Sequence, residues 1–131
     1  MTHSTLERHP LIGADFDDVR ARYGVPLGCA SRGGLLLFAY PGEDGIVDGA
    51  VAVADGVVVR IDAAIRPAPP ATGSKALFGA RAEEAIARFG PARSVVSRGN
   101  ACALEFTTFV AFVLDERIVG VRETAPVTAA R

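Results

Sequence analysis

Histidine is scarce in this chain of 131 residues, and its scarcity limits the chemistry available. The two histidines, His3 and His9, both lie close to the N-terminus. No third histidine exists to act as a general base for Ser31, Ser97 or a cysteine thiol. A site built on paired carboxylates or on lysine is left open, but no motif marks one. We therefore expect a protein that is not an enzyme and has no catalytic residues.

Cysteine is equally rare, which limits disulfides and metal sites. The two cysteines, Cys29 and Cys102, do not have the spacing of a zinc site. A free cysteine is among the most buried residue types, so we expect both to be small core residues. No phosphate loop or dinucleotide fingerprint is present, and the segment EDGIVDG lacks the ligand pattern of a calcium loop. We expect no cofactor and no metal.

Long apolar runs are also missing. Runs such as residues 110–114 fall far short of the ~20 residues that cross a bilayer. The first 13 residues, MTHSTLERHPLIG, do not combine a basic start with a long apolar stretch, as a signal peptide does. We therefore expect a cytoplasmic protein that does not interact with membranes. The net charge of −1 argues against a general nucleic-acid binder.

What the chain does contain is an internal repeat. The segment ARYGVPLGCASRGG at residues 21–34 is echoed by ARFGPARSVVSRGN at residues 87–100, with six identical positions at a constant offset of 66. The two halves differ in charge. Residues 1–65 hold nine acids and five bases, whereas residues 66–131 hold six acids and nine bases. The sequence therefore predicts one architecture used twice, with two different surfaces.

Each copy predicts a short helix followed by four strands. Asp15 is a favourable N-cap with a further acid at Asp18, and an aromatic-glycine pair ends the helices at Gly24 and Gly90. The SRGG and SRGN segments suit two-residue hairpin turns. The expected strands are residues 27–32, 35–40, 50–54 and 57–62 in the first copy, and residues 93–98, 101–106, 110–114 and 117–122 in the second.

The repeat also predicts the overall fold. Repeat 1 covers residues 11–66, a proline-rich connector covers 67–76, and repeat 2 covers 77–124. Because an isolated unit this small buries little core, we expect a single domain in which the two units share their structure. The predicted fold class is α+β: two tandem α-β-β-β-β repeats forming a continuous antiparallel sheet of about eight strands, with two helices on one face.

The order of helix, aromatic-glycine pair, hairpin and closing V-x-x-V/I strand resembles two related groups of proteins. One is the small lipoprotein family of the outer-membrane β-barrel assembly machinery, which has a single copy. The other is the β-lactamase inhibitor protein family, a tandem repeat whose sheet and hairpin loops grip a target. The resemblance covers Leu11–Ile61 and Leu77–Val121. It implies a helix-plus-sheet fold and a role in binding another protein.

One loop distinguishes the two copies. The offset between equivalent turns falls from 66 to 60, so six extra residues lie within PGEDGIVDG at residues 41–49. This loop carries Glu43, Asp44 and Asp48. It is either a soluble turn with two Asp-Gly corners or a binding loop. The resemblance implies that an acidic residue here meets the target, with Asp48 the nearest match and Asp44 the second.

The strands predict an uncovered apolar surface. Alternate residues of two strands should face the helices, yet the opposite face carries Leu35, Leu37 and Phe112. Two short helices cannot cover both faces, so a protein partner, a second copy of the chain or a small apolar ligand should cover the other. Arg32 and Arg98 flank equivalent turns; they either clamp an anion or are simply tolerated at exposed strand ends.

Together these features predict a non-enzymatic protein-binding module. We expect an inhibitor or immunity-type protein that binds a toxin or an enzyme through the open sheet face and the 41–49 loop. The alternative is a homodimeric structural or small-ligand-binding protein that uses the same apolar sheet face.

Overall fold

The computed structural model describes residues 10–124, and His3 and His9 lie outside this range. Its secondary structure has the repeated order that the sequence predicts, and the α+β fold class is confirmed. The first unit comprises α1 (Phe16–Tyr23), β1 (Gly28–Arg32), β2 (Leu35–Tyr40), β3 (Gly49–Ala54) and β4 (Val57–Asp62). The second follows a 3₁₀ helix, η2 (Gly73–Leu77), and comprises α2 (Ala82–Phe89), β5 (Ser94–Arg98), β6 (Ala101–Glu105), β7 (Phe109–Leu114) and β8 (Arg117–Glu123).

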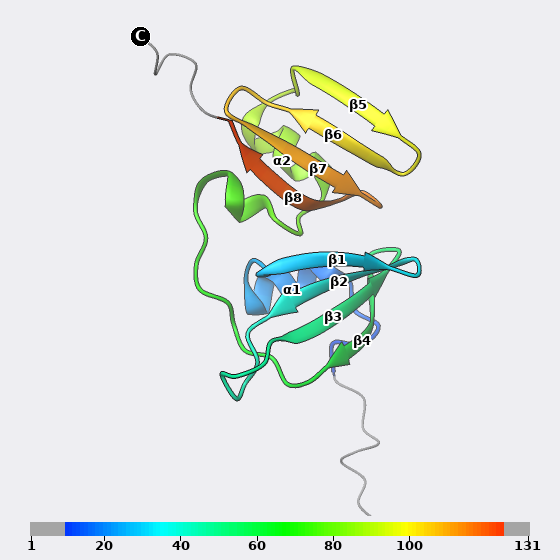
Figure 1. Cartoon of the computed structure of the whole chain (residues 1–131), viewed down its shortest axis with the longest axis vertical. Coiled ribbons are helices and arrows are strands. Elements are labelled where there is room, and N and C mark those ends of the chain that lie inside the picture. Colours follow the sequence, from blue (N-terminus) through cyan, green and yellow to red (C-terminus); the bar gives the residue numbers. More distant parts are fainter. Residues whose placement is uncertain (1–9, 125–131) are drawn as a thin grey trace, which may run out of the picture.

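The prediction of one continuous sheet is wrong, because the strands form two separate antiparallel sheets. Their orders are β1-β2-β3-β4 and β5-β6-β7-β8. Figure 1 shows the edge strands β1 and β8 side by side, with both helices behind the strands. At one end, residues 25–27 and the proline-rich connector line a gap of about 470 Å³ together with Gly120 and Val121 of β8. The two edge strands therefore meet without a strand ladder between them.

The ends of α1 follow from its flanking residues. The Asp15 side chain accepts a hydrogen bond from the backbone N–H of Asp17 at 2.8 Å, which satisfies one free donor of the first turn. The helix stops at Gly24, where φ is +84°, a conformation that favours glycine. The second helix has Arg81 at the position of Asp15, and its side chain makes no capping hydrogen bond.

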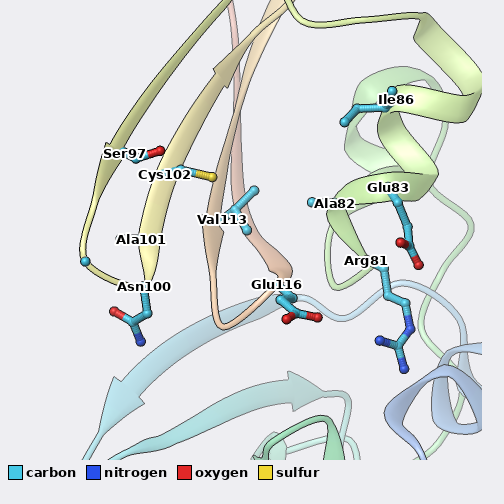
Figure 2. A pocket seen from close by; sticks show the side chains of 11 residues that line it. Arg81, Ala82, Glu83, Ile86, Ser97, Asn100, Ala101, Cys102, Val113 and Glu116 are labelled. Atoms are coloured by element: carbon cyan, nitrogen blue, oxygen red, sulfur yellow. The ribbon is translucent and has the colours of Figure 1, made fainter.

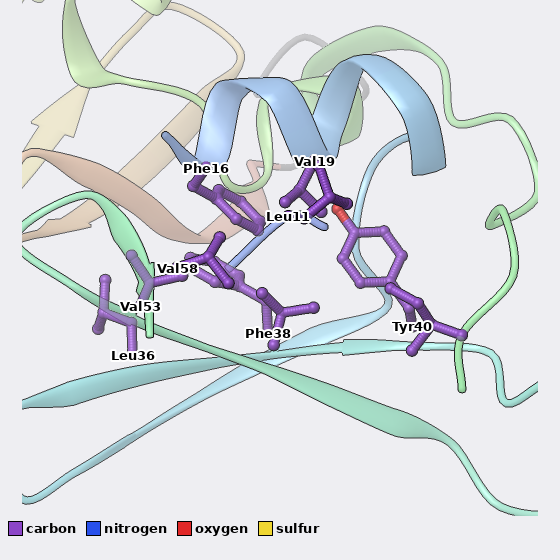
Figure 3. Close-up of a cluster of buried hydrophobic side chains, with 10 residues drawn as sticks. Leu11, Phe16, Val19, Leu36, Phe38, Tyr40, Val53 and Val58 are labelled. Atoms are coloured by element: carbon purple, nitrogen blue, oxygen red, sulfur yellow. The ribbon is translucent and has the colours of Figure 1, made fainter. Parts of the chain in front are cut away.

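The first unit has a well-filled core between α1 and its sheet. Figure 3 shows Phe16 and Val19 extending from the helix towards Phe38 and Tyr40 of the sheet. The rings of Phe16 and Phe38 stack with their centroids 4.2 Å apart, and all four side chains are fully buried. The Tyr40 hydroxyl donates to the carbonyl of Gly24 at 2.7 Å, so the sheet also holds the end of the helix.

The core of the second unit is built from smaller residues. The positions equivalent to Phe16, Val19, Leu36 and Phe38 hold Ala82, Ala85, Cys102 and Leu104. On α2 only Ala85 is buried, while Ile86 and Phe89 remain 43% exposed. The repeat therefore conserves the chain path but not the packing, and it leaves the helix–sheet junction of the second unit partly open.

Both cysteines are free, and each packs beside the core of its own unit. They are partly buried rather than fully buried as expected. Burial raises the pKa of the Cys29 thiol to about 11, so this thiol is largely protonated near neutral pH.

Candidate functional site

The 41–49 loop displays the most exposed large apolar side chains among the described residues. Ile46 is 84% exposed and Val47 is 63% exposed. They lie in the connection between β2 and β3, at the end of the first sheet that is remote from the Gly33-Gly34 turn. Side chains this exposed bury little apolar area in the folded chain, so the pair contributes little to folding.

Hydrogen bonds hold this loop in one shape. At its base, Glu43 N–H donates to the carbonyl of Ala64 and Arg66 N–H donates to the carbonyl of Pro41, both at 3.0 Å. Near the tip, one carboxylate oxygen of Asp44 accepts from Ile46 N–H at 2.8 Å and from Val47 N–H at 3.2 Å. These two backbone donors lower the pKa of Asp44. A loop ordered before binding loses less entropy when it binds.

The three acidic residues predicted in the loop differ in their hydrogen bonding. Glu43, Asp44 and Asp48 are all exposed, but the Asp44 carboxylate turns inward to the loop backbone. Sequence reasoning concentrated on these charges and missed Ile46 and Val47. The signal that could have found them is an apolar pair inside an otherwise polar insertion that the second copy lacks.

The sheet face predicted to be open carries small and medium-sized apolar residues, and it is not exposed throughout, because Ala52 is only 1% exposed. Ala30, Leu37 and Ala52 are direct neighbours across β1, β2 and β3, and Leu35 and Leu37 are half-buried. Phe112, on β7, is 36% exposed and has the Arg122 guanidinium 5.5 Å from its ring centroid. These candidate residues lie on the side away from the helices. Edge strands β8 and β1 separate Phe112 from the two leucines.

The two candidate anion-binding arginines are not brought together. Arg32 ends β1 and Arg98 ends β5, and both are exposed. Strands β8, β7 and β6 lie between them, which corresponds to about 19 Å or more at the usual strand spacing. The two side chains therefore do not form a clamp on one small anion.

An ionic network joins the two units. Arg117 of β8, whose side chain is 2% exposed, donates to the carboxylates of Asp15 and Asp17. Arg81 binds the same two carboxylates at 2.8 and 3.0 Å. The Arg117 guanidinium also donates to the carbonyl of Gly79 at 3.2 Å and lies 5.4 Å from the ring centroid of Phe16. Acidic residues of the first half thus pair with basic residues of the second half, and these ion pairs help to hold the two units together.

The network should make stability depend on pH. Burial raises the pKa of Asp17, but hydrogen bonds from Arg117 and Arg81 outweigh it and leave the pKa below its ordinary value. A lowered folded-state pKa contributes stability above the unfolded value of about 3.9, and that contribution is lost as pH falls through the folded-state pKa. We expect the melting temperature of the wild type to fall more steeply below about pH 5 than that of Asp17→Asn. Equal slopes in a thermal melt series would contradict this role.

Residues 10–124 lack two other kinds of site. No group of three or more His, Cys, Asp or Glu residues in residues 10–124 is placed to hold a metal ion. Over the same residues, no helix has the length and apolar character needed to cross a membrane.

Comparison with known proteins gives little. No protein-family model matches the chain, and no curated protein matches it. A solved structure of an extracellular protein containing an SCP domain, from Bacillus anthracis str. Ames, is similar with a TM-score of 0.37 and 18% identity. The match covers all of this chain, which spans 50% of that chain. A TM-score this low carries no argument about fold or function.

Proposed function

We propose that the chain is a non-enzymatic protein-binding module that inserts its 41–49 loop into a cleft of a partner. The observation that carries this proposal is the exposed Ile46-Val47 pair on a loop held by its own hydrogen bonds. The resemblance to the β-lactamase inhibitor protein family supports an inhibitor or immunity-type role towards an enzyme or toxin. Two free cysteines suit a reducing compartment, so we place this role in the cytoplasm.

The loop also suggests what the partner surface is like. The apolar pair is flanked by the exposed carboxylates of Glu43 and Asp48. A matching cleft would have an apolar floor and a basic rim. The rim charges would mainly speed association and fix the orientation, while the buried apolar contact would supply most of the affinity. The open face beside β2 and β3 continues from the base of the loop and offers a platform for the rest of the interface.

Loop variants test this proposal. Ile46→Ser with Val47→Ser should weaken partner binding by about 2 kcal/mol or more if the pair is a central anchor. Replacing Glu43 and Asp48 by Ser should cost less than about 1 kcal/mol and reduce the salt dependence. Neither change should alter the melting temperature by much, because these side chains are exposed.

A shortened loop is the matched control for length. Trimming the insertion to the length of the equivalent Thr107-Thr108 connection should abolish binding while the chain stays folded. The melting temperature should fall modestly, because the hydrogen bond from Glu43 N–H to the carbonyl of Ala64 is lost. Unchanged affinity in the double serine variant and in the trimmed chain would show that the loop is only a spacer.

A homodimer is the second candidate, because Phe112 and the two leucines expose apolar area on one side of the molecule. Sedimentation separates the two functions. A dimer that persists at low micromolar concentration and dissociates on Phe112→Asp without unfolding would favour the homodimer.

A further inference from the structure

A groove of about 530 Å³ lies between α2 and the β5–β6 hairpin, within the size range of small-molecule sites. Figure 2 shows Ala82 and Ile86 on the helix side and Cys102 and Val113 on the strand side. Ser97 lies on the strand wall, and Arg81, Glu83, Asn100 and Glu116 lie at one end. The groove therefore has apolar walls and a polar end.

The internal repeat explains why this groove is open. Ala82 occupies the position of Phe16, and Cys102 occupies the position of Leu36. In the first unit the Phe16 ring is fully buried and stacks on Phe38. The second unit has only a methyl group where the first has this ring, and the neighbouring Ile86 stays 43% exposed. The groove thus borders the place that an aromatic ring fills in the first unit.

The polar end is negative. Arg81 is bound by Asp15 and Asp17 of the first unit, so its charge is already matched. Within residues 10–124, the carboxylates of Glu83 and Glu116 form no ion pair and accept no side-chain hydrogen bond. Both are exposed at the groove. Glu83 also interacts electrostatically with Arg81. Because Asp15 and Asp17 already match the charges of Arg81 and Arg117, a bound cation would still meet two carboxylates in excess of the nearby positive charge.

The position of Glu116 adds to this pattern. Its φ is +69°, a left-handed conformation that side chains other than glycine seldom adopt. The equivalent residue in the first unit is Gly56, with φ +80°. The second unit thus keeps a carboxylate beside the groove at a turn position that favours glycine.

We propose that this groove binds a small aromatic amine. The ring lies between α2 and the sheet, in the place that Phe16 takes in the first unit, and the ammonium group lies beside Glu83 and Glu116. This site belongs to the second unit and does not depend on the 41–49 loop of the first. Failure of either proposal therefore leaves the other standing.

Titration with phenethylamine tests the proposal directly. We expect a dissociation constant of about 1 mM or tighter by calorimetry or NMR, given the nine non-hydrogen atoms of the probe. The anion 3-phenylpropionate has the same ring with the opposite charge and should bind at least about tenfold more weakly, since it meets two carboxylates.

Three variants locate the binding. Ala82→Phe places in the groove the ring that the first unit has at this position, and it should abolish binding without lowering the melting temperature. Glu83→Gln with Glu116→Gln should weaken amine binding about tenfold, as expected for two partly exposed ion pairs. Glu105→Gln is the matched control, because Glu105 is exposed on the opposite face of the same sheet and should leave binding unchanged.

Cys102 provides a second readout that does not rely on the filling variant. In a Cys29→Ser background, Cys102 in the groove wall is the single thiol. Saturating phenethylamine should slow its alkylation by iodoacetamide severalfold. The proposal is overturned if Cys102 reacts at the same rate with and without the amine, if the two probes bind equally, or if folded Ala82→Phe binds as the wild type does.

Discussion

Arg117→Ala is expected to destabilise the chain by about 2–4 kcal/mol. The Arg117 side chain is almost completely buried and joins Asp15 and Asp17 of the first unit to Gly79 and β8 of the second. Its removal breaks several hydrogen bonds to charged groups, which typically contribute about 1.5–3 kcal/mol each. Arg81 still binds both aspartates in the variant, so the total loss is smaller than the sum of these bonds. It also leaves a cavity against the Phe16 ring. Denaturant unfolding of wild type and variant measures the difference.

Two further arginine variants separate the effect of losing an ion pair from the effects of burial and packing volume. Arg60→Ala breaks an exposed pair with Asp62 at 3.1 Å and should cost less than about 1 kcal/mol. Arg117→Met also takes a partner from Asp15 and Asp17, but it keeps much of the packing volume and avoids the cavity, so its loss should fall between the other two. A loss in Arg117→Ala no larger than in Arg60→Ala would show that the network contributes little.

Separated halves of the chain are expected to be largely unfolded. Each unit is too small to bury much core alone, and each lends groups to the other. Leu114 and Val119 of the second unit pack against the first core. Arg20 of α1 donates to the carbonyls of Ala76 and Phe78, at 2.8 and 3.2 Å. Circular dichroism of residues 1–70 and 71–131, alone and mixed, measures this, and mixing should restore part of the structure.

The intact chain should in contrast unfold in one cooperative transition. A thermal melt with two transitions, or a half that melts cooperatively by itself, would contradict a shared structure. The second half is the more dependent of the two, because its core residues Ala82, Ala85 and Leu104 replace the larger Phe16, Val19 and Phe38.

The repeat allowed most of the local structure to be predicted from the sequence. Asp15 as a cap, Gly24 and Gly90 as helix ends and the hairpin turns depend on neighbouring residues, and these reappear within a residue or two of their expected places. Whether the edge strands β1 and β8 pair depends on contacts between residues far apart in the sequence, which no periodic pattern encodes. A continuous sheet was therefore expected where two separate sheets form.

The functional surfaces were only partly predictable for the same reason. Acids at the start of α1 suit a helix N-terminus, so Asp15 and Asp17 gave no sign of an inter-unit contact. Arginine is seldom fully buried, which concealed the role of Arg117. The 41–49 loop could be predicted because it departs from the repeat. The exposure of Ile46 and Val47 could not, because it depends on the loop conformation that the hydrogen bonds of Asp44 stabilise.

Site-specific photo-crosslinking at the loop tip tests the central claim most directly. A photoreactive residue replaces Val47, and a control chain carries it at the exposed Lys75 of η2. Both are irradiated in extract of the source cell. We predict a protein that is crosslinked from position 47 and not from position 75, and that is displaced by excess wild-type chain but not by the loop-trimmed chain. Identical products at both positions, or equal displacement by the trimmed chain, would contradict a loop-directed binding function.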